Sequence, residues 1–257
     1  MVDGPAGRLH LTDGGAGDDL PIVFIPSLAG TARQWAAQLS HVRRTRRAVA
    51  LELRGHGRSE PPRDRDYSIE SMAVDVDAVL TALRIPRFIV AAHSMGGGVA
   101  LAYAAAHPRQ VGGVFLVDPI DDPSLRPPDA MTSFLHRLDS PEYAAEIENY
   151  WIQILEGAAP GVKDAVVDDL RRTPRETVIG AMVAMGKFNA SRALQHYDGP
   201  VMSVVSRFND VPSSLHRVAP SRVRHVAIAG TSHWVQMDKP DELNRLLDQF
   251  VAGVKSP

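Results

Sequence analysis

The stretch Phe88–Gly97, which reads F-I-V-A-A-H-S-M-G-G, decides the fold of this chain. Its first half is an apolar run of strand type, and after Ser94 the sequence continues into an Ala-rich run of helical type. A tight corner between strand and helix forces its serine into a strained backbone conformation, and small neighbours let the hydroxyl project from the sheet. The pattern therefore predicts a nucleophile at Ser94, although serine is also a common helix N-cap.

A second element near the C-terminus supports this interpretation. The segment Ala229–Trp234 (A-G-T-S-H-W) follows the strand-like run Val223–Ile228 and places His233 on a loop after a strand. This chain order, serine first and histidine last, is that of the α/β-hydrolase triad and differs from the orders in the chymotrypsin and subtilisin folds. Over nearly its whole length the chain resembles the α/β-hydrolase superfamily.

Three motifs carry the resemblance. Around Ser94 the chain reads A-x-S-x-G, with Ala92 where glycine is commoner. In the superfamily pattern G-x-G-H-x-x-x-x-E-x-P, His233 falls on the catalytic histidine and Asp238 on the usual glutamate. The stretch Glu52–Ser59 (E-L-R-G-H-G-R-S) is similar to the D-x-x-G-x-G-x-S turn, with glutamate in place of the usual aspartate, and its glycines indicate a backbone turn near the pocket.

Short apolar runs alternate with helical patterns along the chain, which predicts an α/β fold with a mostly parallel central sheet flanked by helices. The expected strands are Pro21–Pro26, Ala48–Leu53, Phe88–Ala92, Val111–Val117, Val201–Val205 and Val223–Ile228. The segment Ser68–Leu83 carries its apolar residues on one helical stripe, and Ser68 is the expected N-cap. A further helix is expected to start near Pro240.

The stretch Ile120–Gly199 breaks this alternation, because it has helical character throughout and no convincing strand. It opens with a Pro-rich linker, Pro119–Pro128. The resemblance implies a helical cap at this place, inserted after the sixth strand of the fold. We therefore expect one core domain over residues 1–119 and 200–257, with a cap over residues 120–199.

A ligand site in an open α/β sheet lies outside the carboxyl ends of the strands, which here means beneath the cap. Trp151 and Met185 from the cap and Ser27 from the core are the expected pocket residues. Acyl transfer also needs two preorganised N–H donors for the developing oxyanion. The resemblance assigns this oxyanion hole to the backbone amides of Leu28 and Met95.

Two aspartates compete as the acid that orients the histidine. In most relatives the acid follows the strand that corresponds to Val201–Val205, where this chain has Asn209 and then Asp210. Some relatives carry it after the strand that corresponds to Val111–Val117, which points to Asp118. Because an amide would hold the histidine in the wrong tautomer, we prefer Asp118 and keep Asp210 as the alternative.

Composition excludes several classes of site and partner. The chain has no cysteine, which rules out a thiolate nucleophile, a disulfide and a Cys-based zinc site, and nothing points to another metal. Gly55-x-Gly57 lacks the third glycine of a dinucleotide fingerprint, so no cofactor is expected. A net charge of −2 does not indicate a basic surface for binding nucleic acid. Neither a leader nor a membrane segment is evident, so we expect a cytoplasmic protein. Asp121 and Asp122, in the Pro-rich linker, are interpreted as solvated acids.

The resemblance implies a cofactor-independent hydrolase that cleaves a carboxylic ester or lactone of a small to medium hydrophobic substrate. Ser94 would form an acyl-enzyme, which water resolves with His233 as base. A C–C bond hydrolase or a perhydrolase-like enzyme would use the same residues, and some relatives are small-molecule sensors. Epoxide hydrolases and dehalogenases would need a carboxylate at position 94. The sequence leaves the substrate and the oligomeric state open.

Overall fold

A seven-stranded sheet lies at the centre of the computed structural model, which describes residues 1–125 and 128–254 and, for residues 128–131, the backbone alone. The strand order is β3-β5-β4-β6-β7-β8-β9. β3 runs antiparallel to β5, and the other neighbouring strands run parallel. The predicted α/β fold with a mostly parallel sheet is therefore confirmed.

The strands agree closely with the apolar runs of the sequence. In the sheet they are β3 (Leu11–Gly14), β4 (Ile22–Ile25), β5 (Ala48–Leu51), β6 (Phe88–His93), β7 (Val111–Val117), β8 (Val201–Val205) and β9 (Val223–Ala227). A separate hairpin is formed by β1 (Val2–Asp3) and β2 (Arg8–Leu9). Sequence analysis missed β1, β2 and β3, because these short, partly exposed segments contain no apolar run.

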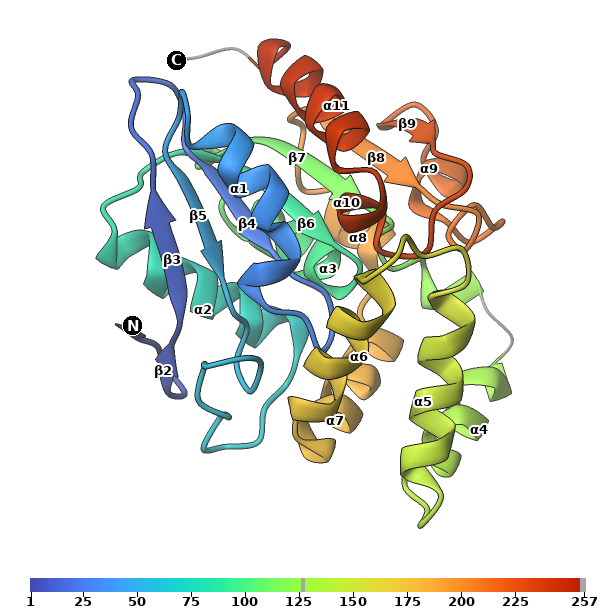
Figure 1. Ribbon diagram of the computed structural model, residues 1–257. Helices are drawn as coiled ribbons and strands as arrows, with labels where there is room; N and C mark the ends of the chain where they lie inside the picture. The colour runs from blue at the N-terminus through green and yellow to red at the C-terminus, as the bar shows by residue number, and fades with distance from the viewer. Residues whose placement is uncertain (126–127, 255–257) are drawn as a thin grey trace.

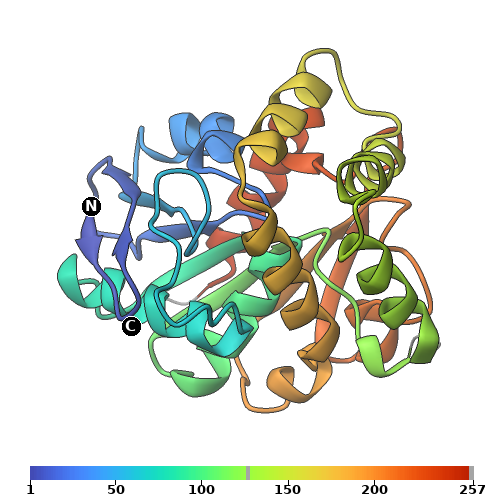
Figure 2. The ribbon, with the colours of Figure 1, turned by 90° about the horizontal axis from the view of Figure 1, so that it is seen from below.

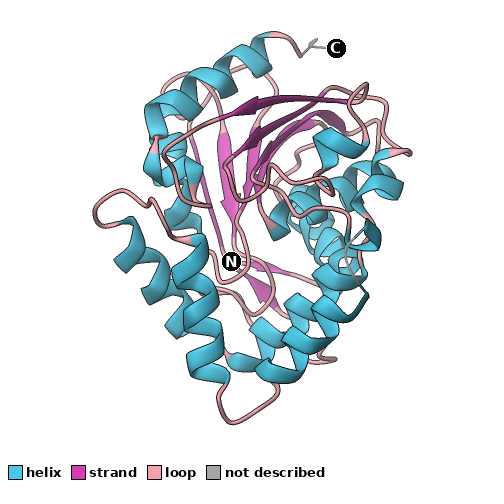
Figure 3. Cartoon of the chain, turned by 90° about the vertical axis from the view of Figure 1, so that its right-hand side faces the viewer, coloured by secondary structure: helices cyan, strands magenta, loops and turns pink. Residues whose placement is uncertain are grey.

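Helices cover both faces of the sheet, as the side view in Figure 3 shows. They are η1 (Ala32–Trp35), α1 (Ala36–Val42), α2 (Ile69–Ala82), α3 (Met95–Ala106), α9 (Leu215–Val218), α10 (Val235–Asp238) and α11 (Pro240–Ala252). Successive side chains of a strand point to opposite faces. In β4, Ile22 and Phe24 therefore belong to the core that includes α1 and α11, while Val23 and Ile25 belong to the core that includes α2 and α3.

The predicted helix start at Ser68 is confirmed. Its side-chain oxygen accepts a hydrogen bond from the amide of Ser71 at 3.2 Å, and α2 begins at the next residue. The cap satisfies one of the backbone donors that the first turn of a helix leaves unpaired. The helix expected near Pro240 is confirmed as α11.

A group of helices is inserted between β7 and β8, at the place where the alternation of the sequence breaks. It consists of η2 (Pro123–Leu125), α4 (Pro128–Leu138), α5 (Tyr143–Ile154), α6 (Val162–Arg172), α7 (Arg175–Lys187) and α8 (Ala190–Leu194). Figures 1 and 2 show α4–α7 beyond the carboxyl ends of the parallel strands. Residues 126–127 of the predicted linker and cap lie outside the described residues, as do residues 255–257 of the predicted core domain.

The turn after β5 has the backbone conformation that its glycines indicated. Gly57 has a φ of 55°, and a Cβ atom there would lie 2.3 Å from Oε2 of Glu52. The Glu52 carboxylate accepts hydrogen bonds from the amides of Arg58 at 2.7 Å and Ala32 at 3.2 Å. Glutamate in place of the usual aspartate thus braces both this turn and the start of η1.

Candidate active site

Ser94 occupies the corner between β6 and α3. Its φ of 52° and ψ of −119° confirm the strained backbone conformation expected from the sequence. Ser94 is only half-buried, whereas its neighbours in the turn are buried. A Cβ atom on Gly96 would lie 2.5 Å from the carbonyl oxygen of Pro26, so the start of α3 fits against the end of β4 only with glycine there. The corner therefore exposes one hydroxyl at the carboxyl edge of the sheet.

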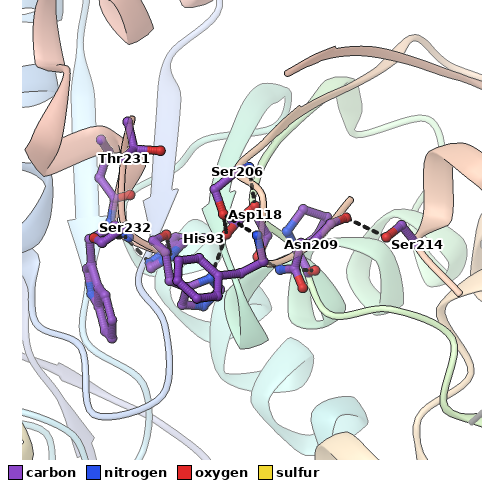
Figure 4. Close-up of polar contacts among 12 residues, drawn as sticks. His93, Asp118, Ser206, Asn209, Ser214, Thr231 and Ser232 are labelled. Carbon is purple, nitrogen blue, oxygen red and sulfur yellow. Dashed lines mark hydrogen bonds and ion pairs between the residues drawn. The ribbon is translucent and has the colours of Figure 1, made fainter. Parts of the chain in front are cut away.

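His233 is hydrogen-bonded to Asp118. The Nδ1 atom of the histidine lies 2.7 Å from Oδ2 of the aspartate, which is fully buried at the end of β7. The amide and the hydroxyl of Ser206 also donate to this carboxylate, each at 2.6 Å (Figure 4). With Nδ1–H donating to Asp118, Nε2 is the histidine nitrogen left to accept a proton.

Asp210, the alternative acid, belongs to a different cluster. Its Oδ1 atom accepts hydrogen bonds from Nε of Arg217 at 2.8 Å and from Nε2 of His216 at 3.1 Å. The hydrogen bond from Arg217 lowers the pKa of the Asp210 carboxyl. The geometry thus brings Asp118 to the histidine and directs Asp210 to the start of α9.

Asn209, which stands where most relatives carry the acid, has a structural role that sequence analysis missed. Its Nδ2 atom donates to the carbonyl oxygens of Asp118 at 2.8 Å and Pro119 at 2.9 Å. The hydroxyl of Ser214 donates to the carbonyl of Asn209 in turn (Figure 4). An amide can donate in this way and a carboxylate cannot, so the residue at position 209 holds the backbone of the residue that bonds the histidine.

His93, directly before Ser94, fixes the backbone of the histidine loop. Its Nε2–H donates to the carbonyl oxygen of His233 at 2.9 Å, and its Nδ1 accepts from Nε2 of Gln236 at 3.1 Å. Burial, together with the charge of the neighbouring histidine, lowers the pKa of His93 well below its ordinary value. The ring therefore stays neutral, as these two hydrogen bonds require.

Asp238 ties the histidine loop to the inserted helices. Its Oδ2 atom accepts from the amide of Ser232 at 2.7 Å and from the hydroxyl of the same residue at 2.6 Å. Its Oδ1 atom accepts from the amide of Ala159 at 2.7 Å, in the segment between α5 and α6. The amide of His233 also donates to the carbonyl of Ile154 at 2.9 Å, at the end of α5. The histidine loop is thus held by the side chain of Asp238 and by the carbonyl of Ile154.

The amides assigned to the oxyanion hole are free donors. Among the described residues, neither the N–H of Leu28 nor that of Met95 donates a hydrogen bond. Leu28 follows β4 and Met95 begins α3, so the two amides lie on the turns of neighbouring strands. Unpaired backbone donors on such turns are what an oxyanion requires.

Ser94 and His233 line one cavity of about 310 Å³ between the sheet edge and the inserted helices. No hydrogen bond joins their side chains within the described part of the chain; such bonds often tighten only when substrate binds. Ser27, Trp151 and Met185, the expected pocket residues, are all in the wall. The other lining residues are Leu28, Ile120, Asp121, Pro123, Phe134, Arg137, Tyr150, Ile154, Met182, Asn209 and Trp234.

The interpretation of Asp121 and Asp122 as solvated acids was wrong. Both are buried, with exposed fractions of 5% and 4%. Asp121 accepts a hydrogen bond from the hydroxyl of Ser213, and Asp122 accepts from the amide and hydroxyl of Ser124. The polar partners that make this burial tolerable come partly from a segment 92 residues away, which sequence spacing does not reveal.

Within the described residues, no group of three or more His, Cys, Asp or Glu side chains is placed to hold a metal ion. No described helix is both long enough and apolar enough to cross a bilayer.

Comparison with known proteins gives a family match and similar folds. The model of the family described as alpha/beta hydrolase fold matches residues 21–188. The chain is 27% identical to the putative carbamate hydrolase RutD of Variovorax paradoxus, over 97% of this chain and 98% of that protein. An esterase of Thermogutta terrifontis superposes with a TM-score of 0.83 at 21% identity, covering 99% and 98% of the two chains. An N-acyl homoserine lactone degrading enzyme gives 0.81 at 24% identity, covering 97% and 99%. At such identities the structural likeness shows the fold alone.

Proposed function

The chain belongs to the α/β hydrolase fold family, and from that premise we propose that it is a serine hydrolase of carboxylic esters or lactones. One observation carries the proposal: Ser94, on its strained corner, shares a cavity with a histidine whose Nδ1 is bonded to a buried aspartate. That constellation is the general solution for activating a serine hydroxyl, which is a weak nucleophile by itself.

In the proposed reaction the Oγ atom of Ser94 attacks the carbonyl carbon while Nε2 of His233 takes the hydroxyl proton. The tetrahedral intermediate collapses to an acyl-enzyme, and the histidine returns the proton to the departing alkoxide. Water then attacks the acyl group with the same nitrogen as base, which releases the acid and restores the serine. Atoms and charges balance without a cofactor.

Asp118 and the free amides supply the electrostatics of this reaction. The carboxylate keeps His233 in the tautomer that presents Nε2 and stabilises the ring when it becomes charged. The N–H groups of Leu28 and Met95 donate to the oxygen on which negative charge develops. Removing one such donor in comparable sites costs about 10²–10³ in kcat.

The cavity favours a small to medium hydrophobic substrate. Its volume of about 310 Å³ is at the lower end of the range for small-molecule pockets, roughly 300–1,000 Å³. Its wall opposite Ser94 is largely apolar, and we propose residues 120–199 as a cap domain that supplies this wall, over a core of residues 1–119 and 200–257.

The decisive experiment is hydrolysis of p-nitrophenyl esters from acetate to decanoate, with Ser94→Ala as the inactive variant. Ser203→Ala is the matched control, since this buried hydroxyl has no hydrogen-bond partner in the described structure. We expect wild type and the control to cleave esters, Ser94→Ala to be inactive, and acid-quenched turnover to leave the acyl group on the peptide that carries Ser94. Folded wild type that cleaves no ester or lactone would contradict the proposal and favour a C–C bond hydrolase, a perhydrolase-like enzyme or a sensor.

A further inference from the structure

A buried glutamine lies at the centre of a polar network that the reaction described above does not use. Gln34, in η1, is 2% exposed. Its Oε1 atom accepts hydrogen bonds from Nε1 of Trp234 at 3.1 Å and from the hydroxyl of Ser27 at 3.3 Å. Its Nε2 atom donates to Oδ2 of Asp169 at 3.1 Å. One side-chain amide thus joins three segments that are far apart in sequence.

Two of these segments carry reacting groups of the proposed mechanism. Ser27 precedes Leu28, whose amide is a proposed oxyanion donor, and Trp234 follows His233. The glutamine oxygen therefore holds the residue next to an oxyanion donor and the residue next to the general base at the same time. A shift of the Oε1 atom of Gln34 would therefore displace both Ser27 and Trp234.

The loop that carries Leu28 is wrapped tightly around the glutamine. A Cβ atom on Gly30 would lie 2.9 Å from Oε1 of Gln34 and 2.8 Å from the carbonyl oxygen of Ser27. Ala29 has a positive φ of 54°, which is uncommon for a residue with a side chain. A loop with so little free space takes its shape from the side chain that it encloses.

The third segment is α6, one of the inserted helices. Asp169 is 4% exposed, accepts a hydrogen bond from the hydroxyl of Thr31 at 3.1 Å and forms an ion pair with Arg33. A carboxylate facing the amide can bind only its NH₂ end, so the oxygen must point to the other side. Asp169 therefore determines the orientation in which Gln34 meets its two other partners.

We propose that Gln34 is a positioning residue for the hydrolysis reaction, oriented by Asp169 so that the oxyanion loop and the histidine loop are aligned only while α6 is docked on the core. The inference rests on the proposed function, because it concerns the placement of that function's oxyanion donor and base. Neither Gln34 nor Asp169 touches the reacting atoms; both act through Ser27 and Trp234.

The first test is Gln34→Glu, which keeps the size of the side chain but removes the NH₂ donor and adds a charge beside Asp169. We expect kcat for p-nitrophenyl butyrate to fall about 10- to 100-fold, the scale of a misplacement of reacting groups by about 1 Å. KM should change by less than about threefold, because the apolar wall of the cavity is untouched. If the variant is not obtained folded, Gln34→Met takes its place and should show the same loss, since it leaves Trp234 without an acceptor and Ser27 with only the carbonyl oxygen of Leu28.

The second test restores the contact with reversed polarity. In Gln34→Glu/Asp169→Asn the new amide on α6 donates to the new carboxylate, whose oxygens again accept from Ser27 and Trp234. We expect kcat to rise from the level of Gln34→Glu to within about threefold of wild type. The matched control is Thr31→Val, which removes another hydrogen bond to the same oxygen of Asp169 and should leave kcat within about threefold of wild type.

The outcomes separate this inference from the proposed function. Active wild type together with an equally active, folded Gln34→Glu would overturn the positioning role. So would a double variant that recovers its melting temperature but not kcat, because the network would then be structural only. A wild type that cleaves no ester counts against the proposed function itself. Gln34 would then only connect α6 to the core.

Discussion

The floor and the roof of the cavity are built by different forces. The floor, formed by Ser94, His233, Leu28 and the aspartate behind them, is fixed by short hydrogen bonds such as the 2.7 Å contact between Asp118 and the histidine. The roof, formed by Phe134, Trp151, Met182 and Met185, is held by ring contacts and apolar packing. Hydrogen bonds fix direction and apolar contacts do not. We therefore expect the floor to determine the reaction and the roof to determine the shape of the substrate.

The largest expected effect lies in the floor. Asp118→Asn should lower kcat about 10⁴-fold, because an amide would favour the wrong histidine tautomer. Asp210→Asn is the matched control: it changes a mainly exposed cluster, so we expect kcat to stay within about threefold of wild type. Steady-state kinetics on p-nitrophenyl butyrate, with circular dichroism to verify folding, makes the comparison. The reverse ranking would transfer the role of the acid to Asp210.

Acid should destabilise the buried turn after β5, which carries His56, whereas the roof residues do not titrate. Burial lowers the pKa of His56 to about 4, against about 6.5 in the unfolded chain. Below pH 6.5, His56 binds a proton in the unfolded state but stays neutral in the folded state. The free energy of unfolding should therefore fall by about 2 kcal/mol between about pH 7.5 and pH 5. His93 acts in the same direction. Urea unfolding at both pH values should show a smaller fall in His56→Gln; an equal fall would contradict the assignment.

The next largest effect is expected at Asp238, which links the floor to the inserted helices. Asp238→Ala should lower the free energy of unfolding by about 1.5 kcal/mol, because the amides of Ser232 and Ala159 lose their acceptor. Asp241→Ala, in the exposed first turn of α11, should change it by less than about 0.5 kcal/mol. Urea denaturation of both variants tests this. Equal effects would mean that the carboxylate at position 238 does not join the two layers.

The smallest expected effect lies in the roof. Met185→Ala shortens a side chain of the apolar wall and so enlarges the cavity. The ratio of kcat/KM for octanoate over butyrate esters should therefore shift about tenfold towards the longer chain. Met237→Ala removes the same side chain from a site that does not line the cavity, so it should leave that ratio unchanged. If Met185→Ala lowers kcat for all chain lengths equally, the roof would share in the catalytic geometry and the contrast with the floor would weaken.

Local sequence predicted the strands and the corner at Ser94 better than the polar contacts around the site, for a physical reason. The corner at Ser94 and the strand end at Val117 are set by residues adjacent in the chain, so the strands and the strained turn were recognisable. The burial of Asp121, the hydrogen bonds of Asn209 and the amide of Gln34 depend on partners far away in sequence. Such contacts leave no periodic pattern, and the antiparallel edge strand β3 was missed because half-exposed strands lack an apolar run.

The position of Asp118 gives the chain a mechanical property. Asp118 directly follows β7, at the start of the segment that leads into the inserted helices, whereas Asp210 follows β8. Any pull on the first inserted segment would act on the acid directly. The two hydrogen bonds from Asn209 to the carbonyls of Asp118 and Pro119 hold the chain at the point where this segment begins. Asn209 would therefore resist a displacement of the Asp118 backbone caused by such a pull.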